Sequence, residues 1–85
     1  MYYIKLTSSD IDFGRSSITE IYVELNTEGR SVREIGYDVH NNVIHKFPSE
    51  SYKDSKYGLF DLAPFDMGNM TSDIALEDFE RMWNN

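Results

Sequence analysis

The stretch from Ile21 to Phe47, IYVELNTEGRSVREIGYDVHNNVIHKF, decides the fold of this chain. Residues 21–25 alternate apolar and larger polar side chains, which is the period-2 pattern of a strand with one buried face. Turn residues follow at 26–29, where Gly29 can adopt positive φ at little steric cost. Val32–Val39 alternates again, and Val43–Phe47 follows a turn at 40–42 that is rich in asparagine. The stretch therefore predicts three successive antiparallel strands.

The flanking sequence adds one strand and one helix. Tyr2–Thr7 has the aromatic and β-branched alternation of a strand, and residues 75–84 place apolar side chains at helical spacing. Ser72 or Asp73 is the predicted N-cap, and the expected helix contribution to the core consists of Leu76, Phe79 and Trp83. Residues 57–65 are apolar but interrupted by Gly and Pro, which predicts an irregular segment over the core. The predicted fold is a single α+β domain, residues 1–85, with an antiparallel meander of about four strands and a C-terminal helix on one face.

Composition limits the class of protein. The 85 residues are 40% hydrophobic and 14% aromatic, which is too apolar for a disordered chain. With no cysteine, the chain can form neither disulfides nor thiolate metal sites, which fits a reducing cytoplasm. No apolar run is long enough to span a bilayer, and the N-terminus does not resemble a signal peptide. We expect a cytoplasmic protein.

Negative charge is concentrated toward the C-terminus. The formal net charge is −7. Residues 1–56 carry nine acidic and seven basic residues, a balance of −2, whereas residues 57–85 carry six acids and Arg81 alone, a balance of −5. Such a surface repels nucleic acid and anionic membranes, but its field complements a basic protein. The sequence therefore indicates binding to a basic protein partner more than catalysis.

Residue types that could carry chemistry occur in incomplete patterns. His40 and His45 could form a general acid/base pair, as in a ribonuclease, but they also fit a turn residue and a strand surface residue, and no third ligand completes a zinc site. Asp10 and Asp12 lie in a Ser- and Gly-containing loop that partly matches a calcium loop, but Phe13 interrupts the required ligand register. We predict no catalytic residue, no metal site and no cofactor.

Three segments carry a resemblance to a known group of proteins. Ile21–Leu25 (Ile-Tyr-Val-Glu-Leu), the return strand with Val32-Arg-Glu-Ile35 and Tyr37, and the terminal Leu76–Trp83 (Leu-Glu-Asp-Phe-Glu-Arg-Met-Trp) resemble a family of small bacterial domains of uncharacterised function. Those domains are similar in size and charge to the immunity proteins of contact-dependent growth inhibition and related polymorphic toxin systems. This chain has Asn41-Asn42 where that family has an Asp-Gly turn, and Ala75 where a serine cap is expected.

The resemblance implies an inhibitor that binds and neutralises a cognate toxin domain, usually a nuclease. We expect acids to steer the encounter and exposed aromatics to anchor it. The predicted partner-binding residues are Asp61, Asp66, Glu77, Asp78, Glu80, Tyr57 and Phe65. The alternatives are a phage-type DNA mimic that uses the same acids, and a small hydrolase or ribonuclease that uses His40 or His45. The sequence leaves the oligomeric state and the toxin's identity open.

Overall fold

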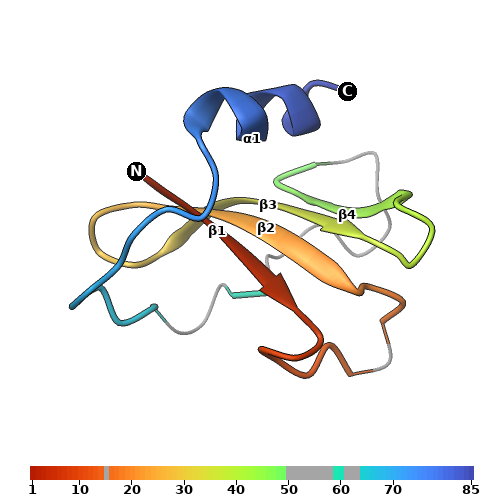
Figure 1. Ribbon diagram of the computed structural model, residues 1–85, viewed down its shortest axis with the longest axis horizontal. Coiled ribbons are helices and arrows are strands. Elements are labelled where there is room, and N and C mark those ends of the chain that lie inside the picture. The colour runs from red at the N-terminus through yellow and green to blue at the C-terminus, as the bar shows by residue number, and fades with distance from the viewer. Residues whose placement is uncertain (15, 50–58, 61–63) are drawn as a thin grey trace.

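A four-stranded antiparallel meander and one helix make up the fold. The computed structural model describes residues 1–14, 16–49, 59–60 and 64–85. Strands β1 (Tyr2–Thr7), β2 (Glu20–Leu25), β3 (Ser31–Tyr37) and β4 (Val43–Phe47) pair in the order β1-β2-β3-β4, and helix α1 (Leu76–Trp83) follows near the C-terminus (Figure 1). The predicted α+β fold, with a meander and a C-terminal helix, is confirmed.

The two faces of the sheet are covered differently. On one face, α1 packs over the sheet, and the buried side chains there are Tyr3, Ile35 and Phe79. On the other face, apolar residues of β1 and β2 pack against irregular segments that include Phe13, Phe60 and Phe65. Strand alternation divides the side chains between these two cores, because successive residues point to opposite faces. The molecule thus has a helical layer, a sheet and an irregular layer (Figure 1).

Both hairpin turns use the residues that the sequence indicates. Gly29 has φ +80° and Asn41 has φ +63°, so each takes the left-handed conformation expected of its residue type. The Asp38 carboxylate accepts hydrogen bonds from the amides of His40 and Asn42. These bonds begin the second turn early, and β3 therefore ends at Tyr37 and not at the predicted Val39.

A register shift in β4 places His45 on the face of the sheet opposite α1. Gly36 pairs with His45, but the next residue, Tyr37, pairs with Val43, so that Ile44 is an extra residue in β4. Val43 packs with the core under α1, whereas His45 points to the opposite face. Strict alternation would place both side chains on one face, because both positions are odd, but the extra residue separates them.

Two details of the helix also differ from prediction. Ala75 occupies the N-cap and makes no side-chain hydrogen bond, because Ser72 and Asp73 are used by β1, as described below. Phe79 is fully buried as expected, but Leu76, in the first turn, is 50% exposed and was wrongly assigned to the core. Within the described ranges, no helix has the length and hydropathy that crossing a membrane requires.

Candidate functional site

The outer edge of β1 is covered by side-chain oxygens. The amides of Tyr3, Lys5 and Thr7 point away from β2, and each donates to a side chain. The acceptors are Ser72 Oγ at 3.1 Å, Asp73 Oδ2 at 2.9 Å and Asp10 Oδ2 at 2.8 Å, respectively. The amide of Asp73 also donates to the Tyr3 carbonyl at 2.7 Å. This arrangement protects the edge from pairing with another chain and fixes the segment that leads into α1.

Residues 64–73 are held at both ends. The Phe65 amide donates to the Gly29 carbonyl at 2.8 Å, and Gly29 lies so close to Phe65 that a Cβ there would overlap the Phe65 carbonyl oxygen. At the other end, Ser72 and Asp73 bind β1. The segment is thereby stretched between the β2–β3 turn and the sheet edge, alongside the apolar side chains of β1.

A groove of about 490 Å³ lies between this segment and β1. Its apolar side chains are buried or half-buried, whereas its two carboxylates are exposed, which gives it an apolar floor and an acidic rim. We call this feature the edge groove and define it by its floor, Ile4, Leu6, Phe65 and Met70, and its rim, Asp66 and Asp73. Two of the predicted partner-binding residues, Phe65 and Asp66, therefore meet in one site.

The other predicted residues lie elsewhere. Glu77 and Asp78 are exposed in the first turn of α1, next to the half-exposed Leu76. Asp78 pairs with Arg81 at 3.3 Å, an exposed contact of the kind that contributes little to stability. Asp61 and Tyr57 lie outside the described residues.

Glu80 belongs to an ion-pair network under the helix. Arg33 binds the Glu24 carboxylate through Nε at 2.8 Å and Nη2 at 2.9 Å, and it also pairs with Glu80. Hydrogen bonds from Arg33 hold the pKa of both carboxyls below its ordinary value. The Tyr3 hydroxyl donates to Glu24 at 2.7 Å, and burial, together with this bond, raises the pKa of Tyr3 to about 12. Glu80 is 40% exposed, but Arg33 balances its charge, so it is less available than Glu77 for steering.

Arg33 also contacts two aromatic rings. Its guanidinium carbon lies 4.9 Å from the centre of the Phe79 ring and 5.1 Å from that of Trp83. One side chain of β3 thus joins a buried carboxylate, a helix carboxylate and the apolar face of α1. The network attaches the helix to the sheet.

A second buried carboxylate organises the opposite face. Glu34 is fully buried and accepts from Ser31 Oγ at 2.6 Å and from the amides of Leu59 and Phe60 at 2.7 and 3.3 Å. His45 Nε2 lies 3.0 Å from Glu34 Oε1. Burial alone would raise the pKa of Glu34, but these hydrogen bonds outweigh it and lower the pKa.

This geometry bears on the hydrolase alternative. His45 is buried against Glu34, whereas His40 lies exposed in the β3–β4 turn. Neither histidine lines the edge groove or the depression that the Asp10–Asp12 loop forms. The contact of His45 is that of a residue that satisfies a buried carboxylate, and it is Glu34 that in turn holds the amides of residues 59–60.

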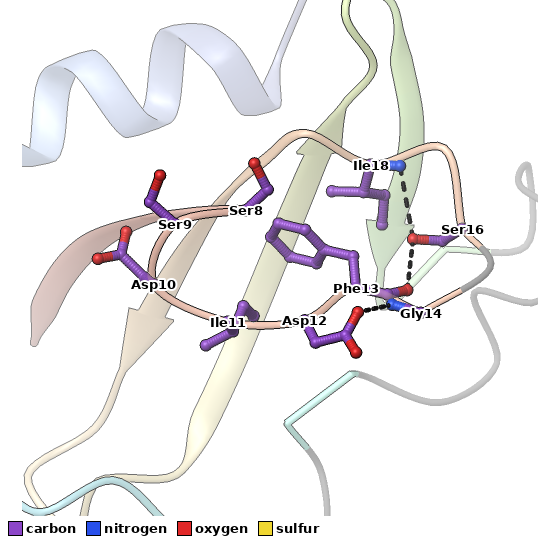
Figure 2. A pocket seen from close by; sticks show the side chains of 9 residues that line it. All are labelled: Ser8, Ser9, Asp10, Ile11, Asp12, Phe13, Gly14, Ser16 and Ile18. Atoms are coloured by element: carbon purple, nitrogen blue, oxygen red, sulfur yellow. Dashed lines mark hydrogen bonds between the residues drawn. The ribbon is translucent and has the colours of Figure 1, made fainter.

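The Asp10–Asp12 loop forms a second depression, of about 470 Å³ (Figure 2). Its two carboxylates are turned apart: Asp10 accepts from the amide and hydroxyl of Thr7, and Asp12 accepts from the Gly14 amide at 2.8 Å. Each carboxylate thus accepts hydrogen bonds from residues two or three positions away, as Asp side chains commonly do in turns. In the part of the chain that the structure describes, no three histidine or acidic side chains converge as metal ligands would.

Sequence reasoning missed four of the six residues that define the edge groove. Ile4 and Leu6 come from the other end of the chain, and Asp73 was interpreted as a helix cap. A usable signal was that Ile4 and Leu6 alternate in a strand at the end of a meander, where one side has no neighbouring strand. The burial of Glu34 also had a signal, because strict alternation in the sequence groups it with Val32 and Gly36.

Comparisons of the chain with protein-family models, with curated proteins and with solved structures found no match. The resemblance to a family of small bacterial domains of uncharacterised function therefore stays a prediction.

Proposed function

We propose that this protein is a cytoplasmic immunity-type inhibitor that binds a basic toxin domain, a nuclease, and blocks its activity. The observation that carries the proposal is the exposure of acidic side chains in the C-terminal third. Asp66, Asp73, Glu77 and Asp78 are exposed there, and Arg81 is the one base that accompanies them in the described part of that region.

The ion pairs of the described residues leave the charges of Asp66, Asp73 and Glu77 in place, whereas Asp78 pairs with the exposed Arg81. Arg33 is engaged with Glu24 and Glu80, and Lys5 lies 3.5 Å from Glu20. Arg33 and Lys5 therefore pair with carboxylates other than the exposed acids of the C-terminal third. The exposed acids can attract a cationic protein, because complementary fields raise the rate of encounter and orient it.

A nuclease toxin suits this surface because enzymes that act on nucleic acids present basic patches to phosphates. An acidic inhibitor competes for the same patch. Charge then sets the association rate, and apolar contacts lengthen the lifetime of the complex. Apolar area next to the acids comes from Leu76, which is half exposed beside Glu77 and Asp78, and from the floor of the edge groove.

The proposal predicts that a neighbouring reading frame encodes a basic toxin domain, and the direct test is protection from that domain. Cells that express that domain should survive when they co-express the native chain. The double variant Glu77→Lys/Asp78→Lys should lose protection, whereas Asp12→Lys/Glu28→Lys, which changes the net charge equally in exposed loops, should keep it. Circular dichroism checks that both variants fold. Equal protection by the two variants, or no protection by the native chain, would reject the proposal.

A further inference from the structure

We propose that the edge groove is the receptor for a single arginine side chain of the basic partner. This inference rests on the proposed function, since it names the group through which such a partner is held. Binding of arginine in the groove can also be tested without the partner.

The lining of the groove matches a long basic side chain in two parts. Ile4, Leu6 and Met70 offer apolar surface for an aliphatic stem, and Asp66 and Asp73 place negative charge at the rim, where a cationic head stays in contact with water. None of the described residues that line the groove is basic. The groove's negative charge is therefore not balanced from within its own walls.

The two carboxylates are held in place and each keeps an acceptor. Asp73 Oδ2 is bound by the Lys5 amide at 2.9 Å, and Asp66 Oδ1 is bound by the Gly68 amide at 3.0 Å. The second oxygen of each carboxylate makes no hydrogen bond to the described residues, and a carboxylate oxygen can accept more than one. A ligand donor would meet acceptors that backbone amides have already oriented.

Arginine fits these features better than other side chains. Its planar guanidinium carries five N–H donors, more than a single carboxylate uses, and it packs favourably on aromatic side chains, one of which, Phe65, lines the groove. A lysine ammonium lacks the planar face. An acidic side chain is repelled, and a purely apolar one would remove water from the carboxylates without any compensating hydrogen bond.

The test is a titration of the isolated protein, observed by NMR at the methyl groups of Ile4, Leu6 and Met70. The probe is N-acetyl-arginine N-methylamide, and its uncharged isostere, N-acetyl-citrulline N-methylamide, is the control ligand. We expect saturable shifts with a dissociation constant in the millimolar range for the arginine probe. The citrulline probe should bind at least five-fold more weakly.

Matched variants localise the effect. Asp66→Asn and Asp73→Asn each keep an oxygen acceptor for the backbone amide, so the segment should stay in place, and each should weaken arginine binding about two- to five-fold. The control pair Asp10→Asn and Asp12→Asn removes the same charge from the second depression and should leave the affinity unchanged.

Equal binding of arginine and citrulline, or equal loss in the control pair, would overturn the inference, as would the absence of saturable shifts. Those results would leave the protection experiment untouched. Conversely, arginine binding in the groove together with failed protection would reject the proposed function alone. The two failures are therefore distinguishable.

Discussion

Glu34 is the main residue that holds the irregular segments in place on the face of the sheet opposite α1. Its carboxylate is buried and joins four groups from β3, β4 and residues 59–60. A buried charge is costly unless it is fully hydrogen-bonded, and removing such a group strands all of its partners.

We expect Glu34→Ala to lower the free energy of unfolding by about 3–5 kcal/mol, because it leaves His45, Ser31 and two amides without their acceptor. Urea denaturation measures the change. Glu28→Ala, at an exposed turn position, should change stability by less than about 0.5 kcal/mol. Similar values for the two variants would show that the carboxylate does not organise this face.

Two glycines with positive φ give a matched pair. A Cβ added at Gly14 would meet open space, whereas at Gly29 the Phe65 backbone occupies that space. Gly14→Ala should lower the free energy of unfolding by about 1–2 kcal/mol, which is the cost of the left-handed backbone conformation alone. Gly29→Ala should cost clearly more and should also displace Phe65, which would shift the NMR signals of the edge groove. A smaller cost at Gly29 than at Gly14 would contradict the packing described.

At the scale of elements, the contact of α1 with the sheet depends on Arg33. Its guanidinium binds carboxylates on β2 and α1 and lies over two rings of the helix. The helix has only eight residues and no side-chain N-cap, so packing and this network must stabilise it.

Arg33→Lys should destabilise the protein by about 1–3 kcal/mol, because lysine keeps the charge but loses the forked hydrogen bonds to Glu24 and the ring stacking. The single tryptophan, Trp83, reports the change through its fluorescence during urea unfolding. Arg30→Lys, at an exposed turn, is the matched control and should be close to neutral. An unaffected Arg33→Lys variant would mean that apolar packing alone attaches the helix.

The sequence predicted the strands closely, because period-2 alternation depends on local neighbours. The sequence-based prediction failed where a side chain bonds to a residue distant in the sequence and not to its own neighbours. Ser72 and Asp73 have the residue types of an N-cap, yet β1, about 69 residues earlier, uses their oxygens. The same limit applies to the site. Phe65 and Asp66 were selected for exposed aromatic and acidic character, but the Ile4–Leu6 wall of the groove follows only from the strand order.

At the scale of the whole molecule, stability should depend on pH through paired carboxyls. Hydrogen bonds lower the pKa of Glu24, Glu34, Glu80 and Asp38 in the folded state. A carboxyl with a depressed folded pKa stabilises the protein above its unfolded value, and this contribution is lost as the pH falls through the folded pKa.

We therefore expect the urea midpoint to fall as the pH decreases below about 4.5, the ordinary value for the glutamates. Glu34→Gln, which cannot titrate at that position, should show a shallower fall than the native chain. A midpoint that stays level down to about pH 3 would contradict the assigned ion pairs and hydrogen bonds.

The proposed function requires that exposed acids of the C-terminal third bring this protein to a cationic toxin domain. It can be tested through the association rate between the purified chain and the toxin domain that the proposal predicts in a neighbouring reading frame, followed across a series of salt concentrations. We expect an association rate that falls steeply as salt screens the charges, with a dissociation rate that changes little. Binding with a salt-independent association rate, or no binding at low salt, would contradict it.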